Sequence, residues 1–186
     1  MSERRVAPDW VKAARSQWAN SSRPAGIVKP GPGQESVWDY PRPPRLERVH
    51  KRVRVQFGGR DIADTLRAMR VCETASPATY YVPPEDVAMD RLAPLSRGSL
   101  CEWKGEASYF DVHAGGKCAP AAAWCYAKPF EEFEEIAGWL AFMPGAMDAC
   151  YVGDARVQAQ PGGFYGGWIT PDLTGPFKGE PGTGHW

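Results

Sequence analysis

Prolines and glycines are spaced so closely along this chain that few stretches could hold a long helix. The 186 residues include 20 Gly and 18 Pro, about a fifth of the chain. Proline interrupts helices and central strands, while glycine favours turns. The length suffices for one domain with a sizeable core plus extensions. The sequence therefore predicts a turn-rich, mainly β protein.

Between the turns, apolar residues alternate with polar ones, as in half-buried strands. Residues 53–57 show this pattern before Gly58-Gly59, and residues 107–112 are a second predicted strand before Gly115-Gly116. Each unit is followed by a strand-like segment that carries a cysteine. This weak repeat predicts a compact, pseudo-symmetric antiparallel β structure, built either as two curled sheets or as a barrel-like fold.

Helical spacing of apolar residues occurs at two places. Residues 129–138 predict the one short helix of the body, with acidic residues suited to its first turn. Residues 8–19 could form another, because Trp10, Ala14 and Trp18 recur on one helical face. A helix this short is marginal alone, so both indoles are expected to pack on the body or on a partner.

Composition divides the chain into three parts. Residues 1–48 form a proline-rich, basic N-terminal arm, residues 49–160 a single β domain, and residues 161–186 a Gly/Pro/aromatic tail. Both extensions carry aromatic side chains that would be costly to leave in water. We therefore expect the two arms to wrap the body and pack on it.

The formal net charge is zero, which argues against nucleic acid as a partner of the whole molecule. Residues 1–54 hold 12 Lys/Arg against 5 Asp/Glu, while the remainder is acidic. This asymmetry favours a basic arm lying on an acidic body, with a nucleic-acid arm as the alternative. No run approaches the length of a membrane span, and no apolar signal segment follows the N-terminus.

The five cysteines are scattered and form no CxxC pair. With three histidines, mostly outside ligand spacing, they predict no metal site. Free thiols also indicate a reducing compartment, so a cytoplasmic location is expected.

The segment Cys101–Phe110 has the densest set of reactive side chains. Cys101 and Lys104 are three residues apart, so in a bend the amine could favour a thiolate. Lys104 could instead present its ammonium to an anion. A Cys101–His113 dyad is a further option, which the spacing does not require. Alternatively, Cys101 is a small buried hydrophobe and Lys104 a surface cation.

Aromatic residues with polar tips could line a pocket for a small planar or sugar-like ligand. Adjacent tyrosines point to opposite faces of a strand, so only one of Tyr80 and Tyr81 can share a pocket with Tyr109. Ordinary core packing is the alternative, especially for Trp124. The candidate catalytic residues are Cys101, Lys104 and Glu73. The candidate ligand-binding residues are Arg70, Tyr80, Tyr81, Trp103, Tyr109, Trp124 and Tyr126.

Several short motifs resemble a family known as domain of unknown function 427, which comprises small bacterial and fungal proteins. The motifs are Val53-Arg54-Val55 with Gly58-Gly59, Glu73-Thr74, Tyr80-Tyr81, Trp103 to Tyr109, Trp124-Cys125-Tyr126 and Ile136-Ala137-Gly138. The flanks, such as 35–44 and 166–179, resemble longer members, so the resemblance is nearly full-length. It implies a compact, mostly β domain without an established activity.

Three functions follow as hypotheses. The first is a small-ligand-binding domain or enzyme whose pocket surrounds Cys101–Tyr109 and takes a small anionic or polar metabolite. The second is a nucleotidyltransferase-like enzyme, a label sometimes attached to the family. Such chemistry needs paired carboxylates and a phosphate cradle, and the sequence has neither pattern. The third is a non-catalytic interaction module that uses the aromatic-rich arms. No cofactor, reaction or oligomeric state follows from the sequence.

Overall fold

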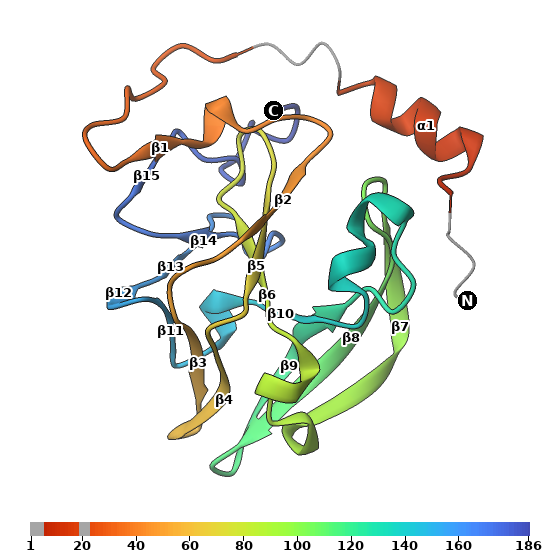
Figure 1. Cartoon of the computed structure of the whole chain (residues 1–186), viewed down its shortest axis with the longest axis vertical. Helices are drawn as coiled ribbons and strands as arrows, with labels where there is room; N and C mark the ends of the chain where they lie inside the picture. Colours follow the sequence, from red (N-terminus) through yellow and green to blue (C-terminus); the bar gives the residue numbers. More distant parts are fainter. Residues whose placement is uncertain (1–5, 19–22) are drawn as a thin grey trace.

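The computed structural model describes residues 6–18 and 23–186 and is mainly β (Figure 1). The β-strands are β1 (Glu35–Ser36), β2 (Arg45–Arg48), β3 (Val53–Phe57), β4 (Arg60–Thr65), β5 (Met69–Cys72), β6 (Thr79–Tyr81), β7 (Leu92–Cys101), β8 (Gly105–Ala114), β9 (Lys117–Cys125), β10 (Leu140–Phe142), β11 (Ala149–Val152), β12 (Ala155–Arg156), β13 (Gln158–Ala159), β14 (Trp168–Ile169) and β15 (Leu173–Thr174). The helices are α1 (Asp9–Ser16) and the 3-10 segments η1 (Val37–Asp39), η2 (Pro84–Asp86), η3 (Met89–Arg91), η4 (Glu131–Ile136) and η5 (Pro144–Ala146).

Three sheets build the body. Their strand orders are β10-β9-β8-β7, β12-β11-β3-β4 and β2-β5-β6, with β1-β15 and β13-β14 as small outlying pairs. Val82 and Leu140 exchange backbone hydrogen bonds of 2.8 and 2.9 Å, which joins the β6 edge to the β10 edge. The first and third sheets therefore continue into one another as a curled layer. Over the described residues, none of the sheets closes into a barrel.

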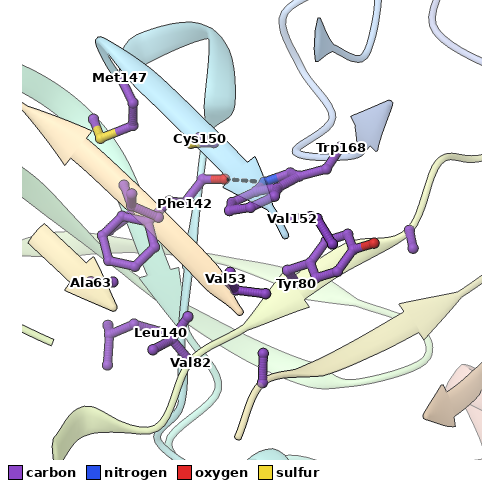
Figure 2. Packing of buried hydrophobic residues seen from close by; sticks show 14 of the residues in the cluster. Val53, Ala63, Tyr80, Val82, Leu140, Phe142, Met147, Cys150, Val152 and Trp168 are labelled. Atoms are coloured by element: carbon purple, nitrogen blue, oxygen red, sulfur yellow. Dashed lines mark hydrogen bonds between the residues drawn. The ribbon is translucent and has the colours of Figure 1, made fainter. Parts of the chain in front are cut away.

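The main core lies between this curled layer and the β12-β11-β3-β4 sheet. Val53 and Val152 of that sheet meet Tyr80, Leu140 and other side chains of the curled layer (Figure 2). Trp168 from the C-terminal tail is fully buried there, and its indole donates a 3.1 Å hydrogen bond to the Phe142 carbonyl. Burial of this indole fixes the tail on the body.

Two glycine turns meet where the β3–β4 and β8–β9 hairpins cross. A Cβ at Gly58 would lie 2.2 Å from the Ala114 carbonyl oxygen, and one at Gly115 would lie 2.3 Å from that of Gly58. Both glycines also have positive φ. Only glycine permits the backbones to approach this closely, which explains the Gly-Gly spacing in the sequence.

The N-terminal arm also packs on the body. Trp38 and Tyr40 are buried in the main core, β1 pairs in parallel with β15, and β2 pairs with β5. Ion pairs link the basic first part of the chain to later acidic residues, including Arg42–Glu73 and Lys51–Asp172. These contacts support the intramolecular interpretation of the charge asymmetry.

The helices differ in detail from the sequence prediction. Residues 131–136 form a 3-10 segment that is kinked at Phe133, where φ is −121°. The buried face of α1 contains Val11, which packs with Ala7 on Phe130. Trp10 is 56% exposed, so its indole does not pack on the body, and the alternative that it packs on a partner stays a prediction.

Candidate functional site

The curled layer has a second buried face, and the candidate site is a cavity on it. Side chains of adjacent residues in a strand point to opposite faces of the sheet. Tyr80 therefore packs in the main core, while Tyr81 packs in a second aromatic cluster on the other face. The cavity has a volume of about 380 Å³, within the size range of small-molecule sites. Predicted residues on its wall are Glu73, Tyr81, Cys101, Trp103, Lys104, Tyr109, Trp124 and Tyr126.

Two predicted ligand-binding residues lie elsewhere. Tyr80 stacks on Trp168 at a ring-centroid distance of 5.0 Å in the main core. Arg70 forms ion pairs with Glu35 and with Glu47. Both side chains make contacts that stabilise the fold, and neither lines the cavity.

A tight turn places the central residues of the site. Cys101 and Gly105 are paired at the end of the β7–β8 hairpin, and Gly105 adopts a φ of +95° that favours glycine. Arg15 of α1 holds this turn from outside. Its guanidinium donates to the Glu102 carbonyl at 2.6 Å and to the Trp103 carbonyl at 3.1 Å.

Lys104 is the buried cation of the cavity. The residue is 8% exposed, and its Nζ lies 5.6 Å from the Tyr126 ring centroid and 5.8 Å from that of Phe133. Among the described residues, none forms a hydrogen bond or ion pair with this ammonium. Burial lowers the pKa of Lys104, but the side chains around it, which are Cys101, two tyrosines and the Glu73 carboxylate, raise it overall. The raised pKa keeps the amine protonated near neutral pH.

Within residues 6–18 and 23–186, two further polar groups on the wall are buried without a hydrogen-bond partner. They are the Tyr81 hydroxyl and the Trp18 indole nitrogen. Burial raises the pKa of Tyr81 to about 12, so its hydroxyl stays protonated and can donate. Buried polar groups normally have partners. Donors left open around a cavity match the acceptor atoms of a ligand.

The second cation on the wall comes from the tail. Lys178 Nζ lies 4.5 Å from the Trp18 ring centroid and donates a 2.7 Å hydrogen bond to the backbone oxygen of Trp186. Burial lowers the pKa of Lys178. Arg42 contacts the Trp18 ring at 5.0 Å. Trp18 thus lies against two cationic groups at the edge of the cavity.

The carboxylates of the wall are Glu73 and Glu102. Glu73 accepts 3.2 Å hydrogen bonds from Arg42 Nε and from Trp103 Nε1. This pairing satisfies Glu73 within the protein and positions the Trp103 ring. The arrangement supports a structural role for Glu73 beside its predicted catalytic one.

The Cys101–His113 dyad considered from the sequence does not form. Cys101 pairs with Gly105 at one end of the β7–β8 ladder, and His113 pairs with Cys118 near the opposite end of β8. Eight residues of strand between Gly105 and His113 span roughly 26 Å. Cys101 therefore has no histidine base from this strand.

Several cavity residues come from the arms and escaped prediction. Trp18 precedes the body, Gln160 is the last residue of the body, and Phe164, Tyr165 and Lys178 follow it. The aromatic content of the arms predicted that they pack on the body, but it did not predict that they reach this cavity. A second cavity of about 670 Å³ shares Phe164 and Tyr165 with the first and is lined mostly by small apolar residues.

Comparison with known proteins identifies a family to which the central part of the chain is similar. The model of a family described as "Domain of unknown function (DUF427)" matches residues 45–153. The chain belongs to this family. The match covers the β body and not the full length, so Trp18, Phe164, Tyr165 and Lys178 lie outside the shared region. No curated protein matches the chain. Along the described residues, no helix is long and apolar enough to cross a membrane.

Proposed function

We propose that this protein binds a small anionic metabolite with a planar body in the cavity around Lys104. The observation that carries the proposal is the buried Lys104 ammonium, which lines the cavity without a hydrogen-bond partner among the described residues. A buried charge is costly unless it is paired. A carboxylate or phosphate of a ligand would supply the missing partner.

The aromatic wall suits the rest of such a ligand. Trp18, Tyr81, Trp124 and Tyr126 present ring surfaces to the cavity, and aromatic rings bind planar or sugar-like bodies well. The open donors on Tyr81 and Trp18 would bind acceptor atoms on the ligand. The site therefore selects for negative charge, a flat body and few donor groups of its own.

Catalysis has less support than binding. Glu73 accepts hydrogen bonds from Arg42 and Trp103, and His113 lies too far along β8 to act as a base for Cys101. Nucleotidyl transfer requires carboxylates paired on Mg²⁺ ions, and of the two carboxylates on the wall, Glu73 and Glu102, the first is held by Arg42 and Trp103. The arms bury Trp38, Tyr40 and Trp168 within the molecule, which leaves fewer aromatics for an interaction module.

A matched ligand set tests the charge preference. Indole-3-acetate, indole-3-acetamide and tryptamine share one ring and carry negative, neutral and positive charge; phenyl phosphate and nucleoside monophosphates extend the anionic group. In a thermal-shift assay, the anionic members should raise Tm and tryptamine should not. Stabilisation by tryptamine but not by the anions would overturn the proposal, because the two carboxylates would then dominate the site.

A further inference from the structure

The β8–β9 hairpin carries a group of side chains outside the Lys104 cavity that the sequence did not predict to act together. Asp111, His113 and Cys118 offer one carboxylate, one imidazole and one thiol, and their ligand atoms all lie within 4.8 Å of one another. His113 and Cys118 are exposed, and Asp111 is partly exposed. The three donors therefore converge on the outer surface of the sheet.

Strand register produces this convergence. His113 and Cys118 are directly opposed across the antiparallel pair, and such partners have Cβ atoms about 4.5–5.5 Å apart. Asp111 is two residues before His113 and thus points to the same face. The buried Val112 between them points to the core.

A bulge in β9 sets the position of the carboxylate. The register passes from Phe110–Ala123 to Val112–Ala119, which leaves residues 120–122 of β9 out of regular pairing. Asp111 Oδ1 accepts a 2.7 Å hydrogen bond from the Ala121 amide within this bulge. This bond orients the carboxylate and leaves its second oxygen available as a ligand.

The distances suit a divalent metal. His113 Nε2 and Cys118 Sγ are 3.8 Å apart. In a tetrahedral zinc site, Zn–S of about 2.3 Å and Zn–N of about 2.0 Å place the two ligand atoms roughly 3.5 Å from each other. Only a small side-chain adjustment would close the difference. Thiolate and imidazole select zinc over magnesium or calcium, which prefer oxygen donors.

We propose that Asp111, His113 and Cys118 form a zinc-binding site on the β8–β9 hairpin, with water as the fourth ligand. Zinc would replace the Cys118 thiol proton, which is released to solvent, and would bind the unprotonated imidazole nitrogen. Binding therefore weakens as the pH falls. Three protein ligands with one open position resemble zinc sites that exchange their fourth ligand more than closed structural sites. The sequence predicted no metal site because the spacing of these three residues arises from strand pairing and not from a CxxC motif.

Cobalt(II) titration of the full chain under metal-free reducing conditions tests the proposal. Wild type should bind one equivalent with a thiolate-to-cobalt charge-transfer absorption, and zinc should displace the cobalt. Cys118→Ser should abolish the absorption, and His113→Gln should weaken binding at least tenfold. Cys101→Ser, which removes the thiol in the Lys104 cavity, is the matched control and should leave the titration unchanged.

Absence of a saturable absorption in folded wild-type protein would overturn the proposal. So would an absorption that persists in Cys118→Ser or disappears in Cys101→Ser. Circular dichroism of each variant establishes that it is folded. Because both substituted residues of the hairpin are on the surface, loss of the fold is not expected from either change.

Discussion

The indole of Trp18 links the N-terminal helix to the candidate site, and its removal should cost far more than removal of Trp10. Trp18 lies on the cavity wall against Lys178 and Arg42. Trp10, in the helix α1 that ends two residues before Trp18, is 56% exposed. The two residues therefore form a matched pair within one short segment.

The expected loss can be estimated from the contacts. A fully buried Trp→Ala change costs about 3–5 kcal/mol, and Trp18 is only partly buried, so roughly half applies. Each cation–π contact adds about 0.5–1 kcal/mol. With two such contacts, Trp18→Ala should lower the free energy of unfolding by about 2.5–4.5 kcal/mol. At about 2–4 °C per kcal/mol for a chain of this size, Tm should fall by about 5–18 °C. Trp10→Ala should change stability by less than about 0.5 kcal/mol.

Urea denaturation followed by circular dichroism measures both variants. A third variant, Trp18→Leu, retains apolar contact but removes the ring, so it should recover about half of the loss. Equal effects of Trp10→Ala and Trp18→Ala would refute the reasoning, because they would show that the indole of Trp18 is not held against the two cations.

Three further predictions concern the fold and its thiols. Gly58→Ala should destabilise by more than 3 kcal/mol in urea denaturation, because its Cβ would meet a backbone carbonyl, whereas Gly59→Ala, with open space, should cost only about 1–2 kcal/mol of φ strain. Similar losses would contradict the hairpin crossing. Arg70→Gln should destabilise the protein most at neutral pH and least near pH 3. Burial raises the pKa of Glu47, but the Arg70 guanidinium lowers it below its usual value overall. The stabilisation from this pair is therefore present above the unfolded pKa of Glu47 and is lost as the pH falls. A difference that stays constant from pH 7 to pH 3 would count against this pairing. Iodoacetamide at pH 8 should label the exposed Cys118 in native protein but not Cys150, because burial raises the pKa of Cys150 to about 12; prompt labelling of Cys150 by mass spectrometry would show that this part of the core is open.

The main features of the fold could be predicted from the sequence because they depend on local pattern. Alternation identified the strand at residues 53–57, likeness to that unit identified the strand at residues 107–112, and Gly-Gly identified both hairpin turns. The same alternation separated Tyr80 from Tyr81, which placed one on each face of the curled layer. These inferences need only the two-residue period of a strand.

The remainder depends on long-range pairing that local pattern does not encode. Trp18 follows the last helical residue, so the helical period that grouped it with Trp10 no longer applied. Lys178 reaches the cavity through a tail whose strands are only two residues long. Asp111, His113 and Cys118 converge through cross-strand register and a bulge. Arg70 has the positive charge expected of a binding residue, but it forms ion pairs with Glu35 and Glu47 from the N-terminal part of the chain.

The central claim is that the Lys104 ammonium binds the anionic group of a ligand. Isothermal titration of the best anionic ligand from the matched set tests it, with Lys104→Met as the variant and exposed Lys128→Met as the control. A hydrogen bond to a charged group contributes about 1.5–3 kcal/mol, so Kd should rise roughly 10- to 150-fold in Lys104→Met and stay unchanged in Lys128→Met. Unchanged affinity in a folded Lys104→Met protein would contradict the claim.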